Sequence, residues 1–222
     1  MGSINRFHTL LGDGAGHFTD TVVPTPDGYT ASQLAALDGD GNPDAIVLGW
    51  QERGIEIYRG DGTGKWTLMA RLMEGAIGRD LALAAINEDG KTDIVVLAAN
   101  RGVTIYLQTR MDAWSAHPAD FFSATREFRS AAVGDINQDG HVDIALNGGF
   151  RGPLERNGPD VYLGDGHGQW ALQEQSGLPA TGLLQPYGIR LGDLNHDDRP
   201  DIIAAHGATE GTGGCVAVWF HR

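Results

Sequence analysis

The chain has 222 residues, 33 of them glycine, and its 29 Asp and Glu residues outnumber its 16 Lys and Arg residues, which gives a formal net charge of −13. A hydrophobic content of 41% argues against a disordered chain, and the acidic balance argues against nucleic acid as a partner, because phosphate binding needs a basic surface. No apolar run approaches the roughly 18 residues of a membrane span, and the first residues carry no apolar signal sequence. The single cysteine, Cys215, excludes an intramolecular disulfide, and we expect it to be a small buried residue of a strand.

Two short motifs recur along the chain. The first is an acidic loop of nine residues, found as ALDGDGNPD (36–44), AINEDGKTD (85–93), DINQDGHVD (135–143) and DLNHDDRPD (193–201), which we number as the first to fourth acidic loops. The second is a glycine-rich hairpin signal, found as GDGAGHF (12–18), GDGTGKW (60–66) and GDGHGQW (164–170), with a degenerate copy TRMDAW (109–114) that keeps its tryptophan. Two motifs that recur in register indicate a repeat protein.

The segments around these motifs predict short β-strands. In chain order, an opening strand lies at about 7–11, the first full repeat has strands at about 32–37, 44–49, 54–59 and 66–71, and a last strand covers 215–221. These runs are apolar or alternating and are separated by Gly, Asp and Asn. Four strands in about 40–50 residues are typical of a β-propeller blade, whereas a parallel β-helix, the runner-up fold, has much shorter repeats.

We therefore predict an all-β fold, a β-propeller of four-stranded antiparallel blades with about four repeats in a single domain of residues 1–222. The repeats cover about 30–75, 79–117, 129–175 and 187–222. Strands within residues 5–20 would complete the last blade if the ring closes within one chain. Two alternatives stay open: a fragment of a larger ring, and self-association of two chains that complete one ring.

The acidic loops offer oxygen ligands at positions 1, 3, 5 and 9, and the backbone carbonyl of position 7 can join them. Ca²⁺ takes six to eight oxygens, and a glycine at position 6 permits the sharp bend that brings them together. The predicted ligands are Asp135, Asn137, Asp139, His141 (carbonyl) and Asp143 in the third loop, Asp193, Asn195, Asp197, Arg199 (carbonyl) and Asp201 in the fourth, Asp38, Asp40, Asn42 (carbonyl) and Asp44 in the first, and Asn87, Asp89, Lys91 (carbonyl) and Asp93 in the second. Ala36 and Ala85 replace the first ligand in two loops, so we expect calcium affinity to fall from the third loop to the fourth, the first and the second.

Other interpretations of these loops are weaker. An EF-hand needs a glutamate at position 12, but all four loops have an apolar residue there. A zinc site is disfavoured because zinc prefers Cys and His ligands, whereas these loops offer Asp and Asn. The main alternative is an Asx-rich turn whose side chains bond only backbone amides. This alternative stays open, most of all for the second loop.

The loop D-x-N-x-D-G-x-x-D followed by an apolar strand, together with the GDGxGxF/W hairpin, resembles the FG-GAP/VCBS repeat family, the calcium-loop blades of integrin α-subunits and many bacterial surface proteins. The resemblance covers nearly the whole chain. It implies a β-propeller, calcium between the first and second strands of each blade, and an extracellular or cell-surface setting. The family's ligand positions match Asp135, Asn137, Asp139 and Asp143, and their counterparts in the fourth loop.

The sequence contains no GxSxG elbow, HExxH motif, Walker loop or Rossmann glycine pattern, and nearly all of the paired carboxylates belong to the acidic loops. The connections between second and third strands, and between blades, vary most among the repeats, and variable loops on a rigid scaffold commonly carry binding. The candidate ligand contacts are Trp50, Arg101, Phe150, Arg151, His206 and Tyr187, with Tyr29, Arg79, Arg129 and Arg156 as further candidates. The tripeptide Arg59-Gly60-Asp61 spells an integrin-recognition sequence, which we interpret as coincidence because it lies in a repeat hairpin.

These features favour a calcium-binding β-propeller that acts as an extracellular binding or adhesion module for a carbohydrate or protein ligand. One alternative is a polysaccharide lyase or hydrolase with its site on the variable loops. Another is a purely structural repeat scaffold. We expect calcium as the only cofactor, and neither nucleic acid nor a membrane span.

Overall fold

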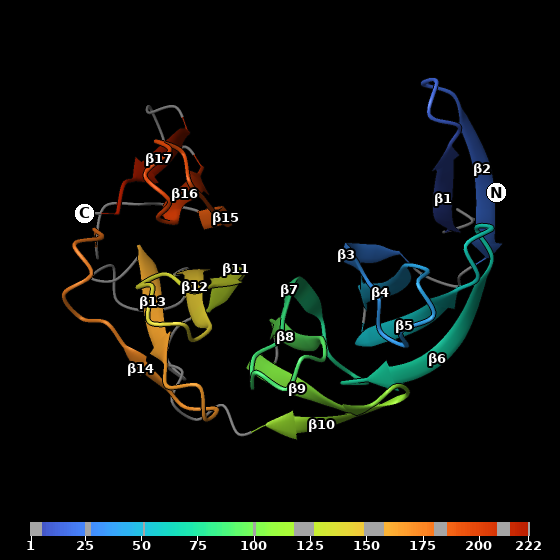
Figure 1. The fold of residues 1–222 in the computed structure, drawn as a ribbon, viewed down its shortest axis with the longest axis horizontal. Helices are drawn as coiled ribbons and strands as arrows, with labels where there is room; N and C mark the ends of the chain where they lie inside the picture. Colours follow the sequence, from blue (N-terminus) through green and yellow to red (C-terminus); the bar gives the residue numbers. More distant parts are fainter. Residues whose placement is uncertain are drawn as a thin grey trace. The chain divides into compact units, whose positions relative to one another are not determined.

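The computed structural model describes residues 6–24, 28–50, 52–99, 101–117, 127–148, 158–179, 186–207 and 214–221. These residues form seventeen β-strands, numbered β1 to β17, and no helix. The strands assemble into sheets in which chain neighbours lie side by side, as in the blades of a β-propeller (Figure 1). The prediction of an all-β propeller fold is therefore confirmed. The chain divides into two compact units, Met1–Gly78 with Arg110–Ala113 and Arg79–Thr109 with Trp114–Arg222.

The first unit holds a two-stranded sheet, β1-β2, and a four-stranded sheet of order β3-β4-β5-β6. The strands are β1 Arg6–Gly12, β2 Phe18–Pro24, β3 Tyr29–Ala35, β4 Asp44–Gly49, β5 Ile55–Gly60 and β6 Trp66–Leu72. The second and fourth strands of the repeat agree closely with the predicted ranges. The first strand begins earlier than predicted. It also ends earlier, because the amide of Leu37 donates to Asp44 instead of pairing along the strand.

The second unit, apart from the turn at Arg110–Ala113, holds three sheets of order β10-β9-β8-β7, β11-β12-β13-β14 and β15-β16-β17. Within this unit the first strands β7, β11 and β15 lie toward one side and the last strands toward the other (Figure 1). The strands are β7 Gly78–Ala84, β8 Asp93–Ala98, β9 Gly102–Arg110, β10 Ala113–His117, β11 Phe128–Gly134, β12 Asp143–Gly148, β13 Pro159–Gly164, β14 Trp170–Leu172, β15 Pro186–Gly192, β16 Asp201–His206 and β17 Cys215–Trp219.

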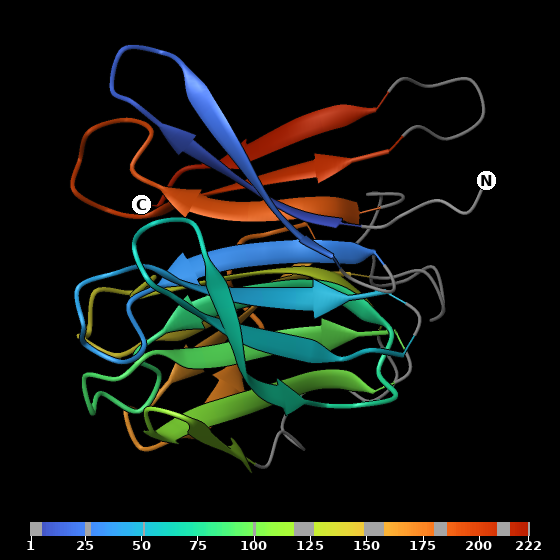
Figure 2. The ribbon, with the colours of Figure 1, turned by 90° about the vertical axis from the view of Figure 1, so that its right-hand side faces the viewer.

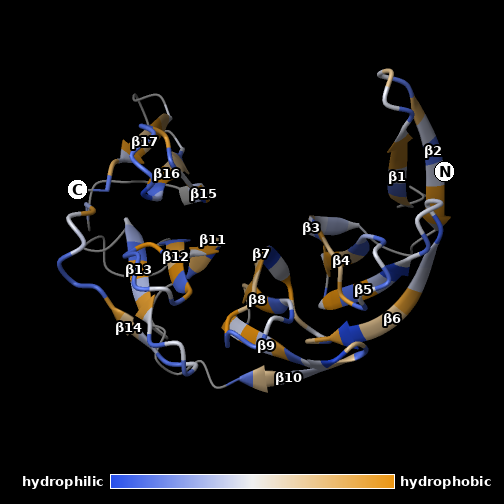
Figure 3. Ribbon diagram, viewed as in Figure 1, coloured by the Kyte–Doolittle hydropathy of each residue, from blue (hydrophilic) through white to orange (hydrophobic). Residues whose placement is uncertain are grey.

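The second strand of each repeat is the most deeply buried. Every residue of β4, β8 and β12 is buried, and these strands carry much of the hydrophobic colour in Figure 3. A strand that packs on both faces needs an apolar run instead of an alternating pattern. The apolar runs after the acidic loops therefore mark the interior of each sheet.

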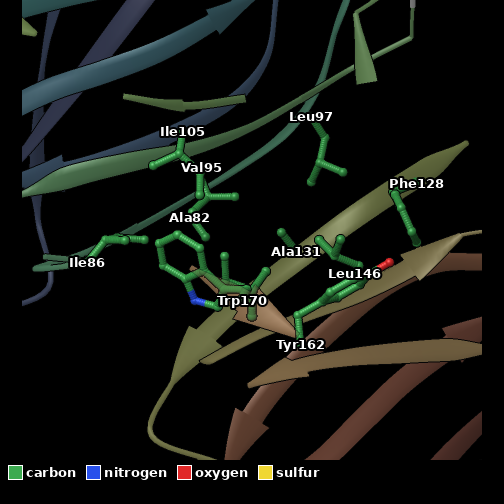
Figure 4. Packing of buried hydrophobic residues seen from close by; sticks show 11 residues of the cluster. Ala82, Ile86, Val95, Leu97, Ile105, Phe128, Ala131, Leu146, Tyr162 and Trp170 are labelled. Carbon is green, nitrogen blue, oxygen red and sulfur yellow. The ribbon is translucent and has the colours of Figure 1, made fainter. Parts of the chain in front are cut away.

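In the second unit, a hydrophobic cluster joins the sheet of β7–β10 to the sheet of β11–β14. The first sheet contributes Val95, Leu97 and Ile105, and its acidic loop contributes Ile86. The second sheet contributes Phe128, Leu146, Tyr162 and Trp170, among others (Figure 4). Trp170 is 5% exposed, as expected for a tryptophan packed between blades. Burying one large apolar side chain stabilises the fold by about 1.5–3 kcal/mol, so this cluster makes a large contribution to holding the two sheets together.

The first glycine of the hairpin motif is required by a close approach of two backbones. A Cβ atom at Gly60 would collide with the carbonyl oxygen of Pro43, and one at Gly164 with that of Val142. The aspartate that follows accepts backbone hydrogen bonds inside the hairpin, as Asp165 does from His167 and Gln169. The motif therefore fixes both the hairpin and its contact with the end of the acidic loop.

The ends of the chain form incomplete sheets. Among the described strands, β1 pairs with β2 alone, and β17 is the last strand of a three-stranded sheet. Completion of the last blade by residues 5–20, self-association and the single domain of residues 1–222 stay predictions. Cys215 is exposed, so its predicted burial is wrong, because the described residues supply no fourth strand to cover β17. The described part of the chain contains no helix with the length and hydrophobicity of a membrane span.

Candidate functional site

The four acidic loops connect the first and second strands of their sheets, and within each unit they lie at the same end of the strands as the glycine-rich hairpins (Figure 2). The aspartate at position 9 opens the second strand and is 0% exposed in all four copies, Asp44, Asp93, Asp143 and Asp201. In each copy one carboxylate oxygen accepts the amide of position 2, and the other accepts an amide at or within two residues of the end of the third strand. Position 9 therefore ties the acidic loop to the third strand.

Burial has an electrostatic consequence at position 9. It raises the pKa of Asp93 and Asp143 above the usual range, although hydrogen bonds from backbone amides oppose this effect. A carboxylate has about four lone-pair sites, so an oxygen that accepts an amide can also face a cation. Position 9 thus stays a predicted ligand, with a structural role in addition.

In the third and fourth loops the side chains at positions 3 and 5 converge. The amide nitrogen Nδ2 of Asn137 lies 2.8 Å from Oδ2 of Asp139, and the same atoms of Asn195 and Asp197 are 3.0 Å apart. Position 1 folds over the same loop, where Asp135 accepts the amides of Asp139 and Gly140. The oxygen-rich donor set suits a hard cation such as Ca²⁺, and rotation of either Asn amide would turn its oxygen toward the aspartate.

The loop backbone adopts left-handed conformations at positions 4 and 6. Position 6 has φ of 92° at Gly140 and 64° at Asp198, which confirms that an aspartate can replace the glycine there. Position 4 has φ of 61° at Gln138 and 63° at His196, a requirement that the sequence pattern did not reveal because no glycine marks it in these loops. These two turns bring the side chains of positions 1, 3 and 5 to one side of the loop.

The first and second loops differ from the others by contacts with basic side chains. Arg59 forms ion pairs with Asp38 and Asp40, and Lys91 forms one with Asp89. Throughout the described ranges, no group of three or more His, Cys, Asp and Glu side chains is arranged to hold a metal ion. The ligand sets of all four loops, with their Asn side chains and position-7 carbonyls, therefore stay predictions.

The predicted contacts on the variable loops differ in exposure. Trp50 is 58% exposed and Tyr187 is 61% exposed, and Arg101 is also exposed. His206 is only 4% exposed, and neither ring nitrogen has a hydrogen-bond partner in the structure. His206 is therefore buried, contrary to the prediction that it lies on the surface. It ends the second strand β16, and the centroid of its ring lies 6.5 Å from that of Trp219. Phe150, Arg151 and Arg156 lie outside the described residues.

A buried polar cluster in the first unit was not predicted. Glu56, in β5, is 0% exposed, and its carboxylate accepts hydrogen bonds from Tyr29 (2.5 Å), Tyr58 (2.9 Å), Arg53 (2.5 Å) and Arg71 (2.9 Å). Burial alone would raise the pKa of Glu56, but these hydrogen bonds outweigh it and lower the pKa to about 2. The available sequence signal was a glutamate in the otherwise apolar and aromatic run IEIY.

Comparisons with known proteins agree with the repeat pattern. A family model described as FG-GAP-like repeat matches residues 37–96 and 85–146. Human integrin alpha-IIb is 29% identical over 215 residues, which cover 83% of this chain and 20% of the integrin. Human integrin alpha-8 is 26% identical over an alignment 247 residues long, and the match covers 97% of this chain and 23% of that integrin. The chain thus spans about a fifth of the length of these curated relatives.

A solved structure shares the fold. It concerns the specific recognition of non-reducing terminal N-acetylglucosamine by an Agrocybe aegerita lectin, and it matches with a TM-score of 0.57 and 16% identity, covering 94% of this chain and 59% of that one. At 16% identity the match supports only a shared fold. The two matches to the repeat model and the integrin relatives, together with the acidic loops and hairpins described above, assign the chain to the family of FG-GAP-like repeat proteins.

Proposed function

We propose that the chain is an extracellular binding or adhesion module in which the third and fourth acidic loops each hold a calcium ion. The observation that carries the calcium part is the convergence of Asn137 with Asp139 and of Asn195 with Asp197. No Lys or Arg side chain of the described residues forms an ion pair with the aspartates of these two loops. A calcium ion held there by positions 1, 3 and 5, the position-7 carbonyl and position 9 would offset two of the negative charges of each loop.

The acidic loops of the second unit contact one another, so an ion in one loop would influence its neighbours. Nε2 of Gln138, in the third loop, donates to the carbonyl oxygen of Asp198 in the fourth at 2.8 Å. His141, in the third loop, lies 2.5 Å from Glu88 of the second loop. Calcium would therefore act as a structural ion that stabilises this end of the unit, since ligand binding to the folded state adds directly to its stability.

We expect calcium to raise the melting temperature and the free energy of unfolding. At ten times the dissociation constant each ion adds about 1.4 kcal/mol. Differential scanning calorimetry in excess CaCl₂ and in EDTA measures the effect, and Asp139→Ala and Asp197→Ala should each remove about half of it. Asp112→Ala, which changes an exposed aspartate outside the acidic loops, is the matched control. Equal melting temperatures in calcium and in EDTA would refute the calcium sites.

The ligand-binding part of the proposal rests on exposed aromatic side chains at the other end of the strands. Trp50 follows β4 in the first unit and Tyr187 lies in β15 in the second, and both expose more than half of their surface. Large exposed aromatic rings suit a sugar or a protein surface. The integrin relatives support an extracellular or cell-surface setting for such a ligand.

We expect the protein to bind a glycan or an extracellular-matrix protein in an array assay. Trp50→Ala or Tyr187→Ala should weaken this binding about tenfold, which corresponds to a loss of about 1.4 kcal/mol in binding free energy. Phe18→Ala is the matched control, because Phe18 is an equally exposed aromatic residue (66%) next to a glycine-rich hairpin. Unchanged binding in both variants, or an equal loss in the control, would contradict a ligand site on the variable loops.

A further inference from the structure

The first acidic loop pairs with a positively charged side chain from outside the loop, that of Arg59. The guanidinium of Arg59, in β5, places Nε 2.6 Å from Oδ2 of Asp38 and Nη2 3.0 Å from Oδ2 of Asp40. Asp38 and Asp40 are positions 3 and 5 of the loop, the two positions whose side chains converge in the third and fourth loops. The Asp38 side chain is 1% exposed, so without Arg59 its charge would have no counterion there.

The position of Arg59 is peculiar to this repeat. The residue after it, Gly60, donates its amide to the position-9 aspartate, and Gln108, Gly164 and His221 make the same hydrogen bond in the other repeats. The residues equivalent to Arg59 are therefore Leu107, Leu163 and Phe220. An apolar side chain at this place cannot neutralise the loop. Arg59 is thus a substitution confined to the first loop, which gives the Arg-Gly-Asp tripeptide a structural explanation.

The second loop shows a simpler version of the same change. Nζ of Lys91, at position 7, lies 2.5 Å from Oδ2 of Asp89 at position 5. The first and second loops are also the two that carry alanine at position 1, Ala36 and Ala85. The third and fourth loops keep Asp135 and Asp193, and no described Lys or Arg side chain pairs with them. Loss of a ligand and gain of an internal cation therefore occur in the same loops.

We propose that Arg59, and in the second loop Lys91, are built-in substitutes for the metal ion, so that these two loops fold without calcium. A guanidinium presents several N–H donors in a fixed plane and can bridge two carboxylates. Calcium would have to displace it and would then find one ligand fewer. On this proposal the residues of the first and second loops do not fit the ion, in contrast to the weak calcium sites expected from the sequence.

The test counts ions bound per chain by isothermal titration with CaCl₂. The ion count rests on the proposed function, and we expect two ions for the parent and two for Ala36→Asp, because Arg59 still occupies the loop. We expect three for the double variant Ala36→Asp with Arg59→Leu, since it restores an aspartate at position 1 and, as in the third repeat, a leucine in place of Arg59. Three ions in Ala36→Asp alone, or two in the double variant, would overturn the proposal.

A second measurement separates this proposal from the calcium sites of the third and fourth loops. In EDTA, Arg59→Leu should lower the melting temperature, because Asp38 and Asp40 then repel each other without any counterion. Arg110→Leu, which removes the same charge from an exposed position of β9, should not. If the parent binds no calcium at all, the proposed function fails, but the melt in EDTA still decides the role of Arg59: equal melting temperatures for the two leucine variants would refute it.

Discussion

Replacing Glu56 by alanine is expected to lower the free energy of unfolding by about 3–5 kcal/mol, the usual cost of removing one partner from a buried ion pair. The carboxylate is 0% exposed and accepts hydrogen bonds from two tyrosines and two arginines. Its loss removes the carboxylate that pairs with Arg53, whose side chain is 14% exposed, and with Arg71, whose side chain is 49% exposed. Urea denaturation followed by tryptophan fluorescence measures the loss.

The matched control for this prediction is Glu74→Ala, because Glu74 is an exposed glutamate of the same unit. Its replacement should change the free energy of unfolding by no more than about 0.5 kcal/mol. A loss in Glu56→Ala that is as small as in the control would show that the four hydrogen bonds contribute no net stability.

The lowered pKa of Glu56 gives this cluster a pH dependence of known sign. The pKa is about 2 in the folded protein against an ordinary value of 4.5, so the unfolded state takes up the proton first as the pH falls. The stabilisation is therefore complete above pH 4.5 and is lost between pH 4.5 and about 2. Glu56→Gln should flatten the pH dependence of the free energy of unfolding in this range, as measured by urea denaturation at several pH values.

The sequence predicted features that depend on residues close together in the chain. The acidic loops, the glycine-rich hairpins and the buried strand at 44–49 are each specified within about ten residues, by turn residues or by an apolar run. The left-handed conformation at position 6 followed from Gly140 and its counterparts. At position 4, Gln138 adopts the same conformation without any local signal.

Features that depend on distant partners were missed. Asp44 and Asp143 have the residue type of a cation ligand, and their second role appears only when an amide 16 or 21 residues away reaches the same carboxylate. Tyr29, 27 residues before Glu56, completes the buried cluster in the same way. The exposure of Cys215 likewise depends on which strand covers β17, which no local pattern specifies. Sequence spacing thus identifies the acidic loops but not the contacts that fix them.

Asp143→Ala is expected to lower the free energy of unfolding by about 4 kcal/mol, in EDTA as well as in calcium. Asp143 accepts the amides of Ile136 (2.7 Å), Asn137 (3.2 Å) and Gly164 (2.8 Å) while fully buried. A hydrogen bond to a charged group contributes about 1.5–3 kcal/mol, and amides left without an acceptor at a buried site add to the cost. Urea denaturation in EDTA measures the contribution of Asp143 without any effect of calcium.

Asp139→Ala is the matched comparison for Asp143→Ala, because Asp139 is an exposed aspartate of the same loop. It should lose stability in calcium and little in EDTA, where it supports only the local turn. If Asp143→Ala behaved like Asp139→Ala, position 9 would act only as an ion ligand. The expected contrast would explain why the first and second loops keep Asp44 and Asp93 although Ala36 and Ala85 have replaced their first ligand. Position 9 ties the loop to the third strand, whereas position 1 accepts only amides of its own loop, as Asp135 does from Asp139 and Gly140, besides its proposed role as an ion ligand.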